Sequence, residues 1–285
     1  MTALISMTNV NKSYGDQHVV SNVNLTINAG QILGLVGPNG AGKTTCLQAL
    51  LGLIGFDGEI DILGFNPKIE REKMLNEVAY ISDVAVLPKW LKVEQALTYM
   101  AGVHPNFNLD KAESFLAKTN IQLKSKIKTL SKGMVTQLHL ALILAVDAKV
   151  LVLDEPTLGL DILTRRQFYN HLLEDFYSEE KCIVVTTHQI EEIEHILTDV
   201  AFIQEGKVVL SESTDNIRDR FKMVAVSEDQ LESAQQLEPL VTNKFMGLTT
   251  MLFDNAEENE LQLLGNISSP SLADIFVGVM SKEAC

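Results

Sequence analysis

The stretch GPNGAGKTT, residues 37–45, is the feature that most constrains what this chain can fold into. It matches the pattern G-x-x-x-x-G-K-S/T, follows the apolar run QILGLV and opens into the helical pattern KTTCLQALLGL. A loop that wraps a polyphosphate with backbone N–H groups needs glycines where a Cβ would collide. The helix behind it points the positive end of its dipole at the phosphates. The stretch therefore predicts a phosphate-binding loop between a buried strand and a helix.

We expect this loop to contact a nucleotide along its whole length. Lys43 would reach the β and γ phosphates, and the Thr44 hydroxyl would hold Mg²⁺. The alternative is a plain glycine turn before a helix, but the strand before the loop and the helix after it favour the nucleotide. The expected contact residues are Gly37, Pro38, Asn39, Gly40, Ala41, Gly42, Lys43, Thr44 and Thr45.

Short apolar runs alternate with helical patterns along most of the chain. Strands are predicted for the runs GEIDIL, VAYIS, VLVLD, CIVVTTH and VAFIQ, and helices for REKMLNEV, FYNHLLEDF and IEEIEHIL. Upstream, Val23, Leu25 and Ile27 alternate with polar residues, as in a half-buried strand. This order predicts an α/β fold with a largely parallel sheet and with sites at the carboxyl ends of its strands.

Two regions depart from this alternation. Residues 83–145 carry helical patterns such as VEQALTYM and KAESFLAK, which predict a helical insertion. Beyond residue 211, strands are predicted for KMVAV, LTTMLF and ELQLLGNI, and an amphipathic helix for SLADIFVGVM. We therefore expect a main domain over residues 1–215 and a small α+β accessory domain over residues 216–285.

The stretch LVLDEPTLGLD, residues 151–161, ends an apolar run in adjacent carboxylates. Acidic side chains seldom lie beside a core strand unless they are paired, cap a helix or hold a metal. With a Mg-nucleotide at a neighbouring strand end, Asp154 would hold the ion directly or through water. Glu155 would then orient or deprotonate the attacking water. The alternative is that either residue merely caps the next helix.

The bulk composition limits the partners. A net charge of −14 argues against direct binding of nucleic acid or of an anionic membrane surface. The most apolar run, LALILAV, has far fewer than the roughly 20 residues of a membrane-spanning helix, so we expect no direct membrane insertion. Three widely spaced cysteines fit a reducing compartment and offer no cysteine-rich metal site. Work at a membrane would need a partner chain.

Four motifs stand in the order found in a known family. GPNGAGKTT, LSKGM (residues 130–134), VLVLDEPTLGLD and TTH (residues 186–188) resemble the motifs of ATP-binding subunits of ABC transporters, over about residues 3–215. The resemblance implies a P-loop ATPase core, with an antiparallel β subdomain and a helical insertion, that uses ATP and Mg²⁺. It also implies a dimer, of two copies or with a homologous ATPase, that sandwiches two Mg-ATP.

The resemblance extends to residues that would act across the dimer. Ser131 and Gly133 of LSKGM would close on the γ-phosphate held by the other subunit, although a plain helix cap is the alternative. Asp161 would cross the dimer interface, or it would cap the helix that starts at Ile162. Lys132 and the following Met stand where the commoner motif LSGGQ has Gly and Gln, which leaves the direction of the lysine open.

Three further residues match family positions. Tyr14 would stack on adenine, with amphipathic packing as the alternative. His188 would contact the γ-phosphate and help to hold the attacking water. Asp83 stands where the family has a Gln that touches Mg²⁺ and water, so it would be a metal ligand or a simple loop residue.

SKGMVTQL and SLADIFVGVMSK resemble a narrower group, the bacterial exporter ATPases that serve separate membrane subunits. This implies a cytoplasmic protein held on the inner face of the cell membrane by a transmembrane permease, which residues 83–90 would touch. One rival is a soluble ABC ATPase of DNA repair, translation or cofactor assembly. The other is a nucleotide-controlled clamp with little turnover, which Asp83 motivates.

Overall fold

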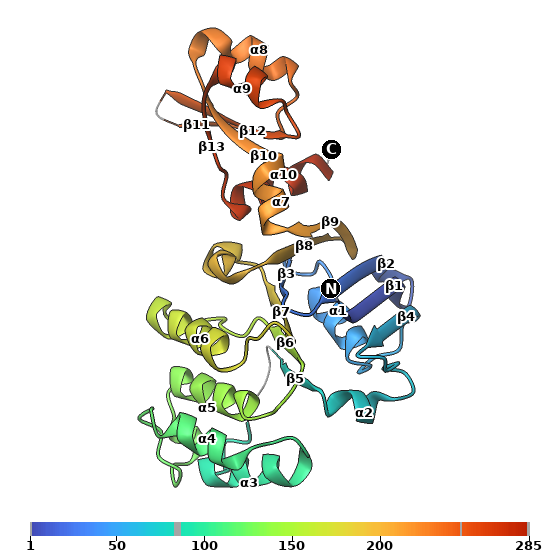
Figure 1. Cartoon of the computed structure of the whole chain (residues 1–285), viewed down its shortest axis with the longest axis vertical. Coiled ribbons are helices and arrows are strands. Elements are labelled where there is room, and N and C mark those ends of the chain that lie inside the picture. Colours follow the sequence, from blue (N-terminus) through green and yellow to red (C-terminus); the bar gives the residue numbers. More distant parts are fainter. Residues whose placement is uncertain (1, 83–86, 246, 284–285) are drawn as a thin grey trace.

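The chain folds around a six-stranded sheet, and the predicted α/β class is confirmed (Figure 1). The computed structural model describes residues 2–82, 87–245 and 247–283. The strand order is β5-β6-β7-β3-β8-β9, with all neighbours parallel except β8 and β9. The central strands are buried along their whole length, as their continuous apolar runs predict. The strands are β3 (Ile32–Val36), β5 (Val78–Ile81), β6 (Val150–Asp154), β7 (Cys182–Thr187), β8 (Asp199–Gln204) and β9 (Lys207–Ser213).

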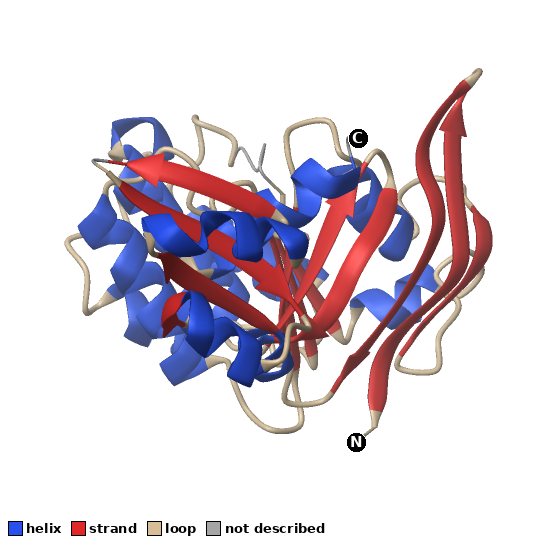
Figure 2. Cartoon of the chain, turned by 90° about the horizontal axis from the view of Figure 1, so that it is seen from above, coloured by secondary structure: helices blue, strands red, loops and turns tan. Residues whose placement is uncertain are grey.

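A separate antiparallel sheet lies at one side of the molecule, next to the N-terminus (Figure 2). In it β1 (Ala3–Tyr14) pairs with both β2 (Gln17–Asn28) and β4 (Asp57–Ile62). The alternating apolar residues of β2 are buried and face α1 (Lys43–Leu50). Because α1 also packs against the main sheet, it lies between the two sheets and joins them in one apolar cluster. The short helix α2 (Arg71–Leu75) follows β4.

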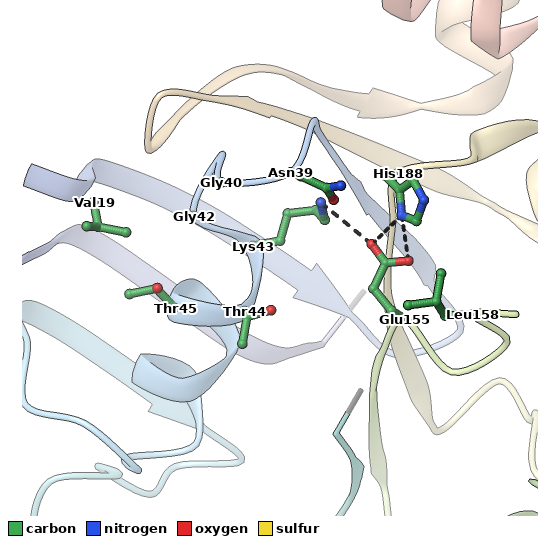
Figure 3. Close-up of a pocket in the computed structure, with 10 residues that line it drawn as sticks. All are labelled: Val19, Asn39, Gly40, Gly42, Lys43, Thr44, Thr45, Glu155, Leu158 and His188. Atoms are coloured by element: carbon green, nitrogen blue, oxygen red, sulfur yellow. Dashed lines mark hydrogen bonds and ion pairs between the residues drawn. The ribbon is translucent and has the colours of Figure 1, made fainter. Parts of the chain in front are cut away.

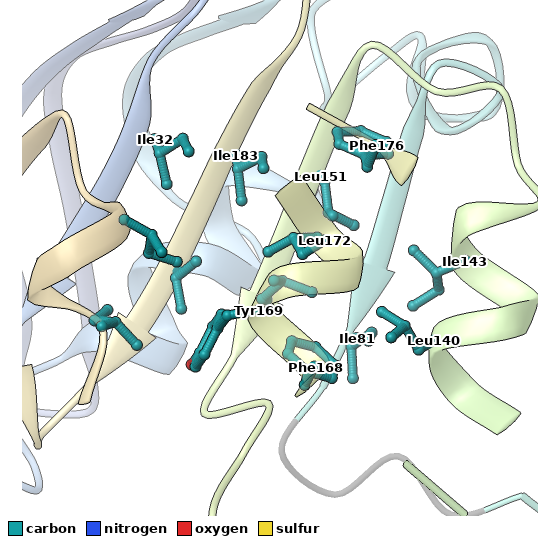
Figure 4. Packing of buried hydrophobic residues seen from close by; sticks show 14 of the residues in the cluster. Ile32, Ile81, Leu140, Ile143, Leu151, Phe168, Tyr169, Leu172, Phe176 and Ile183 are labelled. Carbon is teal, nitrogen blue, oxygen red and sulfur yellow. The ribbon is translucent and has the colours of Figure 1, made fainter. Parts of the chain in front are cut away.

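Helices α3 (Val93–Val103), α4 (Leu109–Leu116) and α5 (Lys132–Leu144) follow β5, with the 3-10 turn η1 (Ile127–Thr129) before α5. Helix α5 packs against α4 on one side and against α6 (Ile162–Asp175) on another. Figure 4 shows Ile81 of β5 between Leu140 of α5 and Phe168 of α6, all within one apolar cluster. The α5–α6 contact therefore ties this helical region to the main sheet.

The prediction of a helix over IEEIEHIL is wrong. The segment forms two 3-10 turns, η2 (Ile190–Glu192) and η3 (Glu194–Ile196). The physical reason is the spacing of its isoleucines. Ile190, Ile193 and Ile196 recur at every third residue and are all buried. A 3-10 helix has three residues per turn, so these side chains point to one side of it.

The C-terminal part has its own antiparallel sheet, with strand order β11-β12-β10-β13 (Figure 1). Helices α8 and α9 cover one face of this sheet, and they share an apolar cluster with β10 and β12. The elements are α7 (Thr214–Arg220), β10 (Phe221–Val226), η4 (Glu228–Gln230), α8 (Leu231–Gln236), β11 (Val241–Phe245), β12 (Leu248–Asp254), α9 (Glu258–Leu264), β13 (Gly265–Ser268) and α10 (Leu272–Glu283).

The strand predicted for ELQLLGNI is correct only at its end. Its first five residues belong to α9, and GNI belongs to β13. Leu261 and Leu264, three residues apart, are buried, whereas Leu263 is 78% exposed. This spacing of buried side chains is that of a helix face, so packing against the sheet decides the element.

The last helix, α10, returns from the C-terminal sheet to the main domain. Leu272 and Ile275 are buried in the main apolar cluster, and the Phe276 ring meets Phe202 of β8 edge to face at 5.2 Å. Helix α10 also packs against η2, the turn that follows β7. Among the described residues, no helix combines the length and the apolar character needed to cross a membrane.

Candidate functional site

The loop between β3 and α1 can be built only with glycines at two of its corners. Gly42 has φ of 101°, and a Cβ there would lie 2.6 Å from the carbonyl oxygen of Val19. At Gly37 a Cβ would collide with the carbonyl oxygen of Ile203. The requirement predicted from the sequence is therefore present in the structure, because strand β8 and the β2 backbone leave no room for a side chain.

Lys43 is folded back over this loop and is only 6% exposed. Its Nζ donates to the carbonyl oxygens of Gly37 at 2.7 Å and of Pro38 at 3.2 Å, and lies 3.6 Å from Glu155 Oε1 (Figure 3). Burial lowers the pKa of Lys43, which Glu155 and Asp154 partly counteract. The Lys43 ammonium thus lies over the loop and contacts two carbonyl oxygens and one carboxylate. A bound anion could replace these contacts.

Asp154 lies at the carboxyl end of β6 and is fully buried. Its Oδ1 accepts hydrogen bonds from Thr186 Oγ1 at 2.6 Å and from Thr44 Oγ1 at 3.2 Å. A hydroxyl beside a carboxylate is an oxygen donor set that suits Mg²⁺, which commonly keeps its waters and binds one or two carboxylates plus substrate phosphates. Thr44 and Asp154 therefore fit the metal, while Asp83, the third expected ligand, lies outside the described residues.

Glu155 follows β6 in a left-handed conformation, with φ of 48°. Its N–H donates to Thr186 Oγ1 at 3.1 Å, and both carboxylate oxygens lie 2.9 Å from His188 Nδ1 (Figure 3). A non-glycine residue in this conformation stores strain that the surroundings must hold, and such residues concentrate at functional sites. The two expected catalytic side chains thus meet, although they come from different strands.

A cavity of about 430 Å³ opens in front of these groups. Its walls come from β2, the phosphate loop, α1 and the ends of β6 and β7, as Figure 3 shows. Eight of the ten lining residues are polar or belong to the phosphate loop, and Val19 and the exposed Leu158 are the two apolar ones. The lining residues are Val19, Asn39, Gly40, Gly42, Lys43, Thr44, Thr45, Glu155, Leu158 and His188.

Seven expected contact residues do not line this cavity: Gly37, Pro38, Ala41, Tyr14, Ser131, Gly133 and Asp161. Ser131 accepts a hydrogen bond from the Met134 N–H at 3.2 Å and caps α5, which also holds Gly133 in its first turn. Asp161 accepts from the Thr164 N–H at 3.0 Å and caps α6. The hydrogen bonds from Thr164 lower the pKa of Asp161. For Ser131 and Asp161 the sequence left open a role as a helix cap. Within a single copy of the chain, both residues act as helix caps.

Tyr14 ends β1 with about half of its surface exposed. Its ring lies 4.8 Å from Lys12 Nζ and is not part of the cavity wall.

The structure also shows the direction of the Lys132 side chain, which the sequence left open. An added Cβ at Gly159 would collide with Lys132 Nζ, so the lysine lies over the loop before α6 in its own chain.

Thr186 is the functional residue that the sequence interpretation missed. It is fully buried and joins Asp154 to the backbone of Glu155 through one hydroxyl. A polar residue at the end of the apolar run CIVVT was the signal available in the sequence.

Comparisons with known proteins find similar sequences and a similar fold. Residues 20–158 match the family model described as "ABC transporter". The chain is 31% identical over 217 residues to the lantibiotic transport ATP-binding protein SrtF of Streptococcus pyogenes, covering 74% of this chain and 92% of the relative. It is 31% identical over 268 residues to the Nod factor export ATP-binding protein I of Cupriavidus metallidurans, covering 89% of this chain and 86% of the relative. A solved structure of an ATP-binding subunit of an ABC transporter superposes with a TM-score of 0.69 at 25% identity, over 76% of this chain and 92% of that one.

Proposed function

Because the chain belongs to the ABC transporter family, as its ATP-hydrolysing subunit, we propose that it powers export through a separate permease in the membrane. Hydrolysis of ATP in this family is coupled to transport. The export direction is inferred from the two relatives named for lantibiotic transport and Nod factor export. The chain's own part in export is the binding and hydrolysis of ATP.

One observation carries this proposal. Lys43, Thr44, Glu155 and His188 line a single cavity and come from three places in the fold, α1 and the ends of β6 and β7, while Asp154 is hydrogen-bonded to Thr44 behind the cavity wall. In our assignment Lys43 and the loop N–H groups bind the β and γ phosphates, and Thr44 and Asp154 hold Mg²⁺. The ion supplies positive charge where negative charge develops on the phosphates.

Glu155 is assigned as the general base. Its carboxylate lies at the cavity, and its position is fixed from behind by the backbone bond to Thr186. His188 is assigned to hold that carboxylate in place through Nδ1, which leaves its second ring nitrogen free to face the γ-phosphate. Attack by water on the γ-phosphate then needs positioning more than covalent chemistry from the protein.

The cavity of one chain is proposed to be half of the site. Ser131, Gly133 and Asp161 cap or begin helices on the surface and do not reach the cavity of their own chain. We assign them to the nucleotide of a second subunit, either another copy or a homologue, and Tyr14 to the adenine of their own chain's nucleotide. Binding of ATP between the subunits would then hold the dimer closed.

The permease is proposed to bind the helical region, next to residues 83–90. Of that segment the structure describes residues 87–90, and Trp90 is 72% exposed. A large exposed aromatic side chain is a common anchor at protein interfaces. The chain would sit on the inner face of the cell membrane through this contact, with residues 1–215 as the ATPase domain and 216–285 as an accessory domain.

The direct experiment is steady-state phosphate release by the purified chain with ATP and Mg²⁺. We expect Glu155→Gln to bind ATP and form a dimer but to lower kcat by about 10³-fold, because the base is lost while the phosphate contacts remain. Glu174→Gln, which removes an exposed carboxylate on α6, is the matched control and should leave kcat unchanged. Normal turnover by Glu155→Gln would remove Glu155 from the role of base.

A further inference from the structure

One arginine links two segments that border the active site. Arg165 lies in the first turns of α6, and its Nη2 donates to the carbonyl oxygen of Leu160 at 3.2 Å. Its Nη1 forms an ion pair with Glu192 of η2. The two side chains are only 16% and 20% exposed, so this pair is shielded from water. The guanidinium therefore joins the loop before α6 to the turn after β7.

Each of these segments carries a residue already assigned to the site. The loop before α6 contains Asp161, and the turn after β7 begins two residues beyond His188. Gln189 is next to His188, and its side-chain amide faces the same Glu192 carboxylate. The amide nitrogen is the atom that donates a hydrogen bond to this carboxylate. The carboxylate of Glu192 is thus the point where Arg165 and the His188 segment meet.

The charge on Glu192 depends on Arg165. Burial raises the pKa of Glu192, and Arg165 is the largest influence that lowers it. Glu192 also feels the charges of His188 and Glu155, so these groups are close enough to interact. Without Arg165, the Glu192 carboxylate would lose its balancing charge and keep only the Gln189 amide, so it would compete with Glu155 for the charge of His188.

We propose that Arg165 is a positioning residue for ATP hydrolysis: it holds Glu192, so that His188 stays on Glu155, and fixes the loop of Asp161 relative to this pair. The inference rests on the roles proposed above for Glu155 and His188. Arg165 itself does not line the cavity. Arg165 keeps the His188 segment and the Asp161 loop in one fixed arrangement. A second subunit that contacts Asp161 would then influence His188 through the Arg165 side chain.

A structural role alone does not account for this pair, because α6 is anchored without it. The buried Tyr169 hydroxyl lies 3.2 Å from Thr157 Oγ1, and Phe168 and Leu172 pack into the main apolar cluster (Figure 4). Arg165 Nε is also buried and makes no hydrogen bond to any described residue. A guanidinium that served stability only would be expected to use that buried donor.

The test is steady-state ATP hydrolysis by purified full-length variants. Arg165→Gln and Glu192→Gln should each lower kcat by about 10- to 100-fold, the range typical for a partner that orients an active-site group, with KM for ATP within about threefold. Arg166→Gln removes the neighbouring exposed arginine, which makes no ion pair with any described residue, and should match the unmodified chain. The charge swap of Arg165→Glu with Glu192→Arg should recover part of kcat.

The decisive readout is non-additivity with His188. If Arg165 acts through His188, Arg165→Gln should lower kcat little further in a His188→Ala background. An equal fall in both backgrounds, a rise in KM alone, or the same loss in Arg166→Gln would overturn the inference. Failure of both Arg165→Gln and Glu192→Gln to fold would make the pair structural and reject it too. Glu155→Gln distinguishes failure of the proposed function from failure of this inference. If Glu155→Gln hydrolyses ATP normally, the proposed site is wrong. If Glu155→Gln is inactive and Arg165→Gln has normal activity, only the inference about Arg165 is wrong.

Discussion

Thr186 connects the carboxylate of Asp154, the proposed metal ligand, to the backbone of Glu155, the proposed base, so Thr186→Val offers a sharp test of how the site is held. Valine keeps the β-branched shape that suits a strand but removes the hydroxyl that bonds Asp154 Oδ1 at 2.6 Å. Hydrogen bonds to charged groups contribute about 1.5–3 kcal/mol to stability. The Glu155 N–H keeps a second acceptor, the Thr186 carbonyl oxygen at 3.3 Å, which limits the loss. We expect unfolding free energy to fall by about 2 kcal/mol.

For a chain of this size such a loss lowers Tm by roughly 4–8 °C. The activity assay is phosphate release as a function of Mg²⁺ concentration, at saturating ATP. Because Asp154 would lose the bond that orients it, the Mg²⁺ concentration for half-maximal activity should rise by about tenfold or more. Two controls separate hydroxyl from shape: Thr186→Ser keeps the hydroxyl, and Thr242→Val makes the same exchange on the exposed strand β11.

The reasoning is refuted by either of two results. One is that Thr186→Val melts with the unmodified chain and needs no more Mg²⁺. The other is that Thr186→Ser shows the same shift in Mg²⁺ dependence as Thr186→Val, since the shift would then come from packing and not from the hydroxyl.

Two further predictions concern the backbone of the loop and the C-terminal helix. Gly42→Ala should abolish ATP binding in an equilibrium titration, because its Cβ would meet a carbonyl oxygen at 2.6 Å, whereas Gly102→Ala in α3 meets nothing within 4 Å and should stabilise the chain by about 0.5–1 kcal/mol. Phe276→Ala removes the ring that packs on Phe202 and should lower unfolding free energy by about 2–3 kcal/mol and speed proteolytic release of α10, while Phe245→Ala, at a 71% exposed position, should do neither. ATP binding at the level of the unmodified chain in the first case, or unchanged protease resistance in the second, would contradict these expectations.

The parts of the fold that the sequence predicts are those set by local demands. The phosphate loop needs glycines because of backbone crowding, and the buried strands need continuous apolar runs, so both can be recognised from short stretches. The elements that failed depend on what they pack against. Leu261 and Leu263 alternate with polar residues as in a strand, but Leu261 and Leu264 are the pair that packs against the sheet, and this packing selects the helix. The direction of Lys132 could not be predicted because the loop it covers lies 27 residues further along the chain.

Thr186 lies between the features that short stretches of sequence predict and those that depend on packing. Strands β6 and β7 are parallel neighbours, and their register pairs Val150 with Cys182 and hence Asp154 with Thr186. The register follows from aligning the two apolar runs at their starts, so the pairing of carboxylate and hydroxyl was available once the strands were known to be adjacent. What the sequence lacked was the strand order, not the register. The Arg165–Glu192 pair is harder to predict from the sequence. It joins α6 to the turn η2, and the sequence of that turn predicts a helix. The residues proposed to bind the nucleotide thus lie in recognisable sequence motifs, whereas the residues proposed to position them can be identified only when separate segments are brought together.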